Sequence, residues 1–528
     1  MLQSRFTTQA LVIGSGIAGA CCALNIAAQG HEVLLLTAGD NLGDGNTAYA
    51  QGGIVARGYD DSPALLSKDI LKAGCKHNRT KAVNHLSKHG PGAVQKMLID
   101  RIGVPFARKE NGDLDMTREG AHSAYRVLYC GDYTGKAIME KLTEAIQAEP
   151  NIKVLSGRTA VDLVTSLHHT TSLSFRYSRT NQCLGAYVYN ESNNTVETLL
   201  ADYTVLATGG AGRLFLHSTN AKCSLGSALA MAHRAGVRLM NAEYVQFHPT
   251  ALFHRSKRLF LITEAMRGEG AHLVNSKGER FMSRYDPRLE LAPRDVVSRA
   301  IVDTLHRSGE DCVFLDCRPV EHNLSQRFPT IYKRCLDLGI NIDNDPIPVV
   351  PAAHYHCGGV YSDLNGLTSL ERLYAIGECS CTGVHGANRL ASTSLLEGVL
   401  WGCNAGDSIG KKLTSKRGVN RRLKDSIPDW QHPGQTQNED PALIAQDWMN
   451  IRSTMWNYAG INRTDQRLSR ACEDLRVLIK DLTLFYKTTP LSKPLIDLYH
   501  GCFAANIVAM SALSNKRSLG CHHLQDNG

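Results

Sequence analysis

The segment ALVIGSGIAG, residues 10–19, decides the fold. Its first four residues are apolar, as in a buried parallel strand, and Gly14, Gly16 and Gly19 fit the pattern G-x-G-x-x-G. The first glycine of this pattern permits a tight turn, the second lets the backbone approach a pyrophosphate, and the third lets the next helix pack on the strand. That helix offers N–H donors at its N-terminus. The segment therefore predicts a dinucleotide-binding βα unit, and the alternative is a βα turn of structural importance only.

The sequence that follows extends this unit. Residues 17–29, rich in alanine and other small residues, predict a helix packed closely on the strand, and residues 31–37 predict a second strand. A Glu or Asp normally closes that second strand and binds the adenosine ribose, but Thr37 stands there. We expect its hydroxyl to make one hydrogen bond in place of the carboxylate.

Two later segments favour FAD over NAD as the dinucleotide. Residues 207–212, ATGGAG, follow a predicted strand, and residues 373–378, LYAIGE, predict a strand that ends in Gly377 and Glu378. This glycine–acid pair is suited to holding a ribityl chain. The alternative for each segment is an ordinary glycine turn.

With 528 residues the chain has room for about three domains. A long loop is expected at 41–60, helices within 64–101 and 135–147, and β-strands within 151–206. From about 240 to 347 the composition changes to polar loops and short helices, which predicts an inserted second domain. A basic and then Pro/Gln-rich linker is expected at 411–441. Apolar residues at helical spacing beyond it predict a small helical bundle.

Composition is that of a soluble globular protein, with 43% hydrophobic and 20% charged residues. No apolar run approaches the roughly 18–20 residues that a membrane span needs, and no export signal is apparent. The sixteen cysteines are scattered, and the close pairs Cys21–Cys22 and Cys379–Cys381 lack metal-ligand or redox spacing. We therefore expect reduced thiols in the cytoplasm and no bound metal.

The net charge of +8 fits an anionic cofactor and substrate as well as a nucleic acid. One basic run could mark a flavoprotein that modifies RNA. No aromatic residues interleave with this run, as they do in single-strand binding surfaces, so a solvated linker and no nucleic-acid partner are favoured. The run contains Lys411, Lys412, Lys416, Arg417, Arg421, Arg422 and Lys424.

Seven motifs occur in the order that one flavoprotein family shows. They are YAQGG (49–53), ATGGAG (207–212), QFHPT (246–250), TE (263–264), GEG (268–270), PRD (293–295) and HGANRLA (385–391). Over about residues 8–405 the chain resembles the succinate dehydrogenase, fumarate reductase and L-aspartate oxidase flavoproteins. The resemblance is closest to the aspartate oxidase branch.

The resemblance implies an α/β FAD-binding Rossmann-like domain with an inserted α+β capping domain and a C-terminal helical bundle. The expected ranges are 1–239 and 348–410 for FAD binding, 240–347 for the cap and 442–528 for the bundle. Membrane-bound succinate dehydrogenases link FAD to a histidine before their Gln-Gly-Gly. Residues 46–49, NTAY, hold no histidine, so non-covalent FAD is expected. The predicted cofactor positions are Gly14, Ser15, Gly16, Ala18, Gly19, Thr37, Asn46, Thr47, Ala48, Gln51, Gly52, Gly53, Thr208, Gly209, Gly210, Glu378, Arg389, Ser394 and Leu395.

The resemblance also implies a dicarboxylate site. Arginine binds a carboxylate with a bidentate fork that lysine cannot form, and it stays charged when water is excluded. The implied substrate-binding residues are Thr263, Glu264, His248, His354 and Arg389, and the implied catalytic residues are Arg294, His248, His354, Arg389 and Glu119. Outside such motifs, each Arg would be taken for a surface ion pair and each His for a packed residue. Glu264, beside Arg267, is ambiguous because it could simply orient a guanidinium.

Glu119 matches the aspartate oxidase position thought to meet the substrate amino group. A carboxylate there would attract an ammonium and discriminate against succinate, which has none. The alternative is an exposed loop acid paired with Arg118.

The implied reaction is FAD-dependent oxidation of L-aspartate to iminoaspartate. Oxygen, giving hydrogen peroxide, or fumarate, giving succinate, would reoxidise the flavin. In the family this is the first step of NAD synthesis through quinolinate, with quinolinate synthase as the partner, and a monomer or homodimer is expected. Arg294 resembles the residue that donates a proton in fumarate reductases. The alternative is a soluble fumarate reductase or succinate dehydrogenase flavoprotein, which predicts covalent FAD or an iron–sulfur partner and no acid at position 119.

Overall fold

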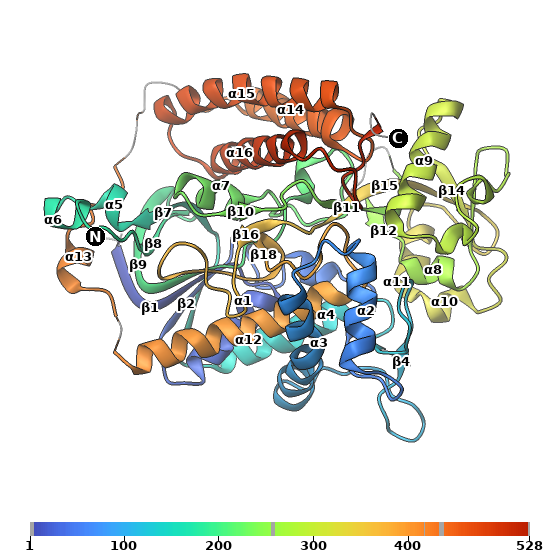
Figure 1. Ribbon diagram of the computed structural model, residues 1–528, viewed down its shortest axis with the longest axis horizontal. Coiled ribbons are helices and arrows are strands. Elements are labelled where there is room, and N and C mark those ends of the chain that lie inside the picture. Colours follow the sequence, from blue (N-terminus) through green and yellow to red (C-terminus); the bar gives the residue numbers. More distant parts are fainter. Residues whose placement is uncertain (1–4, 255–258, 417, 432–433, 435–437, 526–528) are drawn as a thin grey trace.

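The computed structural model describes residues 5–254, 259–416, 418–431, 434 and 438–525 (Figure 1). Its main sheet has seven strands, and the five nearest the G-x-G-x-x-G turn run parallel. Along the sheet the strands are β6 (Ile152–Leu155), β2 (Val33–Leu36), β1 (Arg5–Ile13), β9 (Thr195–Leu206), β8 (Cys183–Asn190) and β7 (Arg158–Thr165), with β17 (Leu373–Ala375) also paired to β9. This confirms the predicted Rossmann-like sheet. The first strand begins earlier than expected, because Arg5 already pairs with Thr198 of β9.

Both faces of the main sheet are covered, and successive residues of β1 point alternately to the hydrophobic cores on the two faces. Ala10 and Val12 join the core that contains α1 (Ile17–Ala27) and α12 (Thr393–Thr414). Leu11 and Ile13 join the core that contains α7 (Ser227–Arg234). Parallel strands buried on both faces read as continuous apolar runs, which is why residues 10–13 stand out in the sequence.

Helices α1 and α12 touch backbone to backbone because α12 presents glycines. A Cβ at Gly402 would lie 2.5 Å from Ala18 O, and one at Gly406 would lie 2.9 Å from Cys22 O. Small residues on both helices therefore hold α1, whose N-terminus is predicted to bind phosphate, firmly in place. The helix runs on to Thr414, so residues 411–414 are helical rather than linker.

Two lysines of the basic run form contacts with other residues of the protein. Lys412 Nζ donates to Tyr374 OH at 2.6 Å, and Lys424, in α13 (Arg421–Asp425), pairs with Asp202 at 2.8 Å. Arg417 lies outside the described residues. These contacts do not favour an RNA-binding surface.

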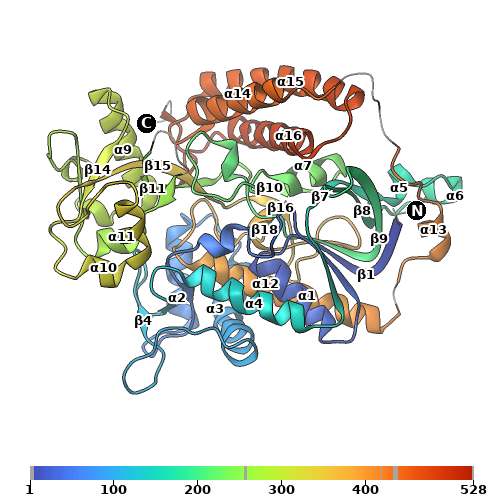
Figure 2. The ribbon, with the colours of Figure 1, turned by 180° about the vertical axis from the view of Figure 1, so that it is seen from behind.

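The inserted region forms an α+β unit at one end of the molecule (Figure 2). Its five-stranded sheet is antiparallel and has its own hydrophobic core. The strands are β12 (Phe260–Leu261), β11 (Val245–Leu252), β15 (Ile347–His356), β14 (Val313–Asp316) and β13 (His272–Val274), and the helices are α8 (Glu264–Gly268), α9 (Arg294–Ser308), α10 (Leu324–Arg327) and α11 (Pro329–Leu336). Since β11 and β15 run from the part predicted to bind FAD into this sheet, they carry side chains to the junction.

Shorter elements complete the part predicted to bind FAD. The loop predicted at 41–60 contains a 3-10 turn, η1 (Asn46–Tyr49), and a short strand. The helical region predicted within 64–101 consists of α2, α3 and a π-helical turn, and the helix predicted within 135–147 is α4. The bounds are α2 (Pro63–Ala73), α3 (Thr80–Val94), η2 (Gln95–Arg101), α4 (Thr134–Ala148), α5 (Ser166–His169), α6 (Leu173–Arg176), β3 (Ile54–Val55), β4 (Met116–Thr117), β5 (Val127–Leu128), β10 (Leu239–Met240), β16 (Gly359–Tyr361), β18 (Ser380–Cys381), η3 (Gly212–Leu214) and η6 (Gly377–Cys379).

The predicted C-terminal bundle is confirmed. It consists of α14 (Pro441–Ala459), α15 (Asp465–Thr488) and α16 (Lys493–Ser514). By length and composition α16 alone among the described helices could cross a membrane, with a mean hydropathy of 1.2, although 67% of that window is buried in the protein. It packs among α14, α15 and α7, as the core helix of the bundle does.

Burial of His500 on α16 gives a pH-dependent stability. The side chain is 1% exposed, its Nε2 lies 3.0 Å from Val161 O, and burial, with the Arg234 charge, lowers its pKa to about 3. Since the folded pKa lies below the unfolded one, only the unfolded state takes up a proton as the pH falls from 6.5. The free energy of unfolding, relative to a His500→Asn variant, should then fall by about 1.4 kcal/mol per pH unit between pH 6 and 4. Denaturant titration at saturating FAD measures this slope, and the exposed His306→Asn is the control; equal slopes in all three proteins would contradict the prediction.

Candidate active site

The turn between β1 and α1 has the geometry of a phosphate-binding loop. Gly14 has φ +113°, and a Cβ there would lie 2.2 Å from Ala207 O. A Cβ on Gly19 would lie 2.0 Å from Gly14 O, so only glycine lets the helix approach the strand. Gly16 caps α1 without a side-chain hydrogen bond, and Thr47 Oγ1 accepts from Ile17 N at 3.2 Å. This hydrogen bond ties the loop that contains Thr47 to the start of α1.

Unpartnered polar atoms lie beside this turn, as a buried ligand requires. Gln51 Oε1 and Thr208 Oγ1 are buried and have no hydrogen-bond partner among the described residues. Glu378 approaches the glycines closely, since a Cβ on Gly210 would lie 2.1 Å from Glu378 Oε1. Burial raises the pKa of Glu378 to about 7, against the hydrogen bonds from His356 N (3.0 Å) and Asn46 Nδ2 (3.3 Å). A narrow, polar and incompletely satisfied cradle of this kind fits a dinucleotide.

The structure brings most predicted cofactor positions together. Ser15 Oγ bonds Leu42 O at 2.8 Å, and Asn46 Oδ1 accepts from Ala221 N at 2.7 Å, which ties the loops around the turn. A Cβ on Gly53 would lie 2.2 Å from Leu128 O, and Ser394 Oγ accepts from Arg389 at 3.3 Å. The remaining positions, Ala18, Ala48, Gly52, Gly209 and Leu395, belong to the same turn, loop and helix starts.

Thr37 does not have the setting expected of a ribose ligand. Its Oγ1 lies 3.4 Å from Asn41 O and accepts from Gly39 N at 3.4 Å. The hydroxyl therefore interacts within its own turn. Thr37 occupies the position of the usual acid, but its hydroxyl is not placed as a ribose ligand.

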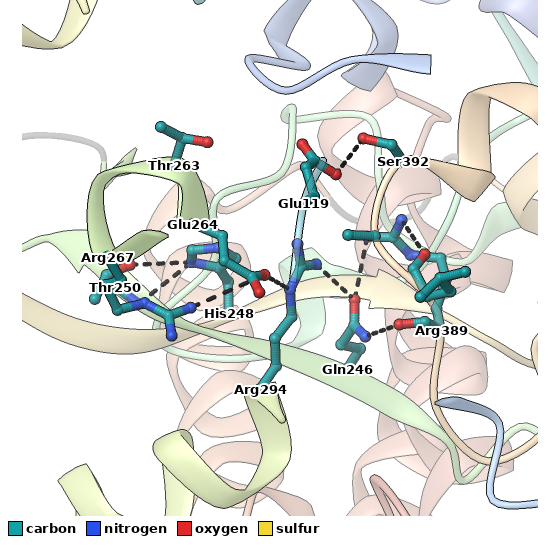
Figure 3. Close-up of polar contacts among 12 residues, drawn as sticks. Glu119, Gln246, His248, Thr250, Thr263, Glu264, Arg267, Arg294, Arg389 and Ser392 are labelled. Carbon is teal, nitrogen blue, oxygen red and sulfur yellow. Dashed lines mark hydrogen bonds and ion pairs between the residues drawn. The ribbon is translucent and has the colours of Figure 1, made fainter. Parts of the chain in front are cut away.

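Two arginines from distant segments converge on one amide (Figure 3). Gln246 Oε1, on β11, accepts from Arg294 Nη1 and Arg389 Nη2, both at 3.1 Å. Gln246 Nε2 donates to Asn388 Oδ1 at 2.7 Å and to Arg389 O at 2.9 Å, which fixes the amide orientation. The neutral amide holds both guanidinium groups without neutralising either.

Glu264 orients one of these arginines. Arg294 Nε donates to Glu264 Oε2 at 2.6 Å, and Arg267 Nη2 lies 3.9 Å from the same oxygen. Burial raises the pKa of Glu264, but the Arg294 and Arg267 charges outweigh it and bring the pKa to about 2. Glu264 is therefore ionised, and its role in the structure is to hold Arg294.

Arg389 differs because none of the described acids forms a salt bridge with it. Its guanidinium lies 4.4 Å from the centre of the Tyr355 ring, and its buried Nε has no hydrogen-bond partner in the described chain. The side chain is 5% exposed. A buried cation compensated mainly by an aromatic face and carbonyl oxygens is well prepared for a carboxylate ligand.

Two neutral imidazoles lie edge to face beside the arginines. His248 and His354 have ring centres 5.3 Å apart. Burial and the Arg294 charge lower the pKa of both. Since Thr250 N donates to His248 Nδ1 at 3.2 Å, the ring carries its proton on Nε2, which is buried and unpartnered among the described residues. His248 therefore offers one N–H donor to a bound oxygen.

Glu119 also reaches this cluster, and Arg118 is not its partner. Ser392 Oγ donates to Glu119 Oε2 at 2.5 Å, whereas Arg118 stacks on Tyr125 at 5.3 Å. Burial raises the pKa of Glu119, against the Ser392 hydrogen bond and the Arg294 and Arg389 charges. A Cβ on Gly52 would lie 2.6 Å from Glu119 Oε1, so the carboxylate touches the predicted cofactor loop.

Thr263 lies at the edge of the group and joins none of the contacts drawn in Figure 3. Its Oγ1 caps α8 by accepting from Ala265 N at 3.4 Å. Sequence reasoning did not single out Gln246, Ser392 or Tyr355 as site residues. Gln246 could have been found, because residues two apart in a strand share a face and His248 follows at that spacing. Ser392 and Tyr355 carry no comparable local signal.

Comparisons with known proteins agree with this geometry. A family model described as an FAD binding domain matches residues 9–395. The L-aspartate oxidases of Pseudomonas aeruginosa and Vibrio cholerae are 42% and 41% identical, covering 99% and 98% of this chain and 96% and 95% of those proteins. A mutant E. coli quinol fumarate reductase FrdA is 27% identical with TM-score 0.86, covering 100% of this chain and 92% of that one. Mycobacterium smegmatis Sdh1, solved with UQ1, is 26% identical with TM-score 0.82, covering 99% and 89%.

These matches confirm the predicted family, its fold class and FAD as the cofactor. The family model spans the glycine turn, the dicarboxylate cluster and the start of α12, and the curated relatives extend over the C-terminal bundle as well. The chain belongs to the L-aspartate oxidase family of FAD-binding flavoproteins.

Proposed function

We propose that this chain oxidises L-aspartate to iminoaspartate. The observation that carries the proposal is the convergence of two guanidinium groups, one imidazole N–H donor and one buried carboxylate beside the cofactor cradle. A four-carbon diacid with an amino group needs this set of partners: cations for its two carboxylates and an anion for its amine. Bound FAD supplies an acceptor for the hydride equivalent that leaves the substrate.

In this proposal Arg389 and Arg294 bind the two carboxylates, and His248 and His354 add hydrogen bonds. Glu264 keeps the Arg294 fork oriented, and Gln246 fixes the separation of the arginines. Because the imidazoles are neutral at pH 7, they donate hydrogen bonds without adding charge to a site that already holds two cations.

Glu119 acts at the amino end. The amine must be neutral when its lone pair forms the imine, so a proton has to leave the ammonium. Burial raises the pKa of Glu119, which makes its carboxylate a better acceptor for that proton. The same charge selects L-aspartate over succinate.

Several further proposals follow from the family. Oxygen or fumarate would take up the electrons, giving hydrogen peroxide or succinate, and Arg294 would serve as proton donor when fumarate is reduced. The product would enter NAD synthesis through quinolinate, with quinolinate synthase as a partner. The enzyme would work in the cytoplasm as a monomer or homodimer with non-covalent FAD, because residues 46–49 supply no histidine. The domain limits at 239/240 and 347/348 also remain proposals.

A soluble fumarate reductase is the second candidate, because fumarate reductase structures share the fold at 27% identity. Product analysis separates the two. Purified protein given FAD, L-aspartate and air should release hydrogen peroxide, ammonia and oxaloacetate, the last two from hydrolysis of the imine. Succinate in place of aspartate should give no comparable turnover. Peroxide or fumarate formed from succinate, with none of the three products from L-aspartate, would overturn the proposal.

A further inference from the structure

His354 lies at an irregularity in the pairing of β11 with β15. Gln246 lies opposite Tyr355 on β15. The next residue of β11, Phe247, lies opposite Ala353. His354 therefore has no residue opposite it and forms a β-bulge, which turns the side chain of the extra residue out of the regular alternation of the strand. Because the strand pairing does not fix the direction of the imidazole, other contacts must do so.

The segment 217–220 lies against this bulge. A parallel bridge joins Ser218 to Ala353, the residue before the bulged histidine. Asn220 Nδ2 donates to His354 O at 2.9 Å, which gives the carbonyl of the bulged residue a hydrogen bond. The backbone of the bulge is therefore held by a segment that lies more than 130 residues earlier in the chain.

Thr219, in the same segment, reaches the imidazole itself. Its side chain is buried, and its Oγ1 lies 3.1 Å from His354 Nδ1. The hydroxyl also lies 3.4 Å from Ala353 O, but that carbonyl already accepts from Thr219 N at 3.1 Å and from Ser218 Oγ at 3.4 Å. Since a carbonyl oxygen has two lone pairs, the Thr219 hydroxyl is left to donate to His354 Nδ1.

This hydrogen bond decides which nitrogen of His354 carries the proton. A neutral imidazole that accepts at Nδ1 has its proton on Nε2. Nε2 of His354 forms no hydrogen bond with a described residue, and the side chain is partly exposed, so this N–H is open to a ligand. The neighbouring ring of His248, 5.3 Å away between centres, also carries its proton on Nε2 because Thr250 N donates to its Nδ1.

We propose that Thr219 is a positioning residue, whose hydroxyl fixes His354 as the Nε2–H tautomer so that both histidines present N–H donors to a bound dicarboxylate. The proposal rests on the dicarboxylate site of the proposed function and adds what sets its pattern of donors. The opposite tautomer would direct a lone pair at the anion. Because neither nitrogen of His354 then has a free lone pair, the proton of the substrate ammonium is left to Glu119.

NMR of the FAD-loaded protein with ¹⁵N-labelled histidine tests the tautomer directly and needs no substrate. The signals of His354 are identified by their loss in His354→Gln. The wild type should show a protonated Nε2 and a hydrogen-bonded, unprotonated Nδ1. Thr219→Val keeps the shape and removes the hydroxyl, so it should shift the Nδ1 signal and lower the share of the Nε2–H tautomer, whereas Thr219→Ser should restore the wild-type spectrum. A protonated Nδ1 in the neutral ring of the wild type would overturn the proposal.

The dissociation constant of malonate tests the consequence for binding. Malonate has two carboxylates but no pair of adjacent saturated carbons to oxidise, so it reports binding without turnover. Thr219→Val should weaken it by roughly three- to tenfold, the size of one hydrogen bond, and Thr219→Ser by less than about twofold. Thr219→Ala serves if the valine variant does not fold. The matched control is Thr198→Val, which removes another buried hydroxyl, on β9, and should change neither the spectrum nor the constant.

An unchanged malonate constant in Thr219→Val, or an equal loss in Thr219→Ser or Thr198→Val, would contradict a role through the hydroxyl. Turnover of L-aspartate by the wild type is followed separately. A protein that shows the expected tautomer and the expected malonate constants, but does not oxidise L-aspartate, would count against the proposed function and not against Thr219.

Discussion

Replacing Arg389 by methionine is expected to lower kcat/KM for L-aspartate by about 10²–10³. The methionine side chain fills similar space against the Tyr355 ring, so packing is retained while the charge is lost. The effect is large because Arg389 is 5% exposed, has no acidic partner among the described residues, and would meet a substrate carboxylate away from water. An unpaired carboxylate left in such a site costs several times more than an exposed one.

Steady-state kinetics at saturating FAD measure this effect. Arg118→Met is the matched control, because Arg118 is exposed and its contact among the described residues is with the Tyr125 ring. The control should keep kcat/KM within about twofold of the wild type. A loss of less than about tenfold in Arg389→Met would mean that another cation binds the carboxylate.

Glu119→Gln is expected to change substrate selection. The amide keeps the size of the side chain and can still accept from Ser392, but it attracts no ammonium and accepts no proton. We expect kcat/KM for L-aspartate to fall by about 100-fold, the size of a lost charged partner. The inhibition constant of succinate should stay unchanged or decrease, because succinate presents no ammonium and the amide removes a buried negative charge beside it.

The kcat/KM for L-aspartate and the inhibition constant of succinate are measured on the same variant, so each serves as a control for the other. A structural role for Glu119 would weaken both ligands alike. Parallel losses for L-aspartate and succinate would therefore contradict the selective role of this carboxylate.

The sequence was sufficient for the parts of the fold that depend on local chemistry. The turn at Gly14–Gly19 can be predicted because only glycine tolerates the φ of Gly14 and the close contacts at Gly14 and Gly19, and the apolar run before it indicates a buried strand. The C-terminal bundle follows from helical periodicity. The linker was predicted to begin too early, at residue 411, since lysines near a helix C-terminus are compatible with helix and Lys412 is fixed by Tyr374.

The site was only partly accessible from the sequence. The arginines and His248 were assigned through motifs, and His354 through the resemblance. The approach of the two histidines depends on the register of β11 against β15, which no single segment encodes. Gln246 was quoted within a motif, but its contact with both arginines appears only in three dimensions. The approach of Thr219 to His354 spans 135 residues and had no local signal at all.

The most direct test of the central claim is anaerobic mixing of the FAD-loaded protein with L-aspartate or with succinate, followed by flavin absorbance. Our account predicts that L-aspartate bleaches the absorbance much faster than succinate, because the site pairs two cations with one buried acid for the amine. Bleaching by succinate that is as fast or faster would contradict it.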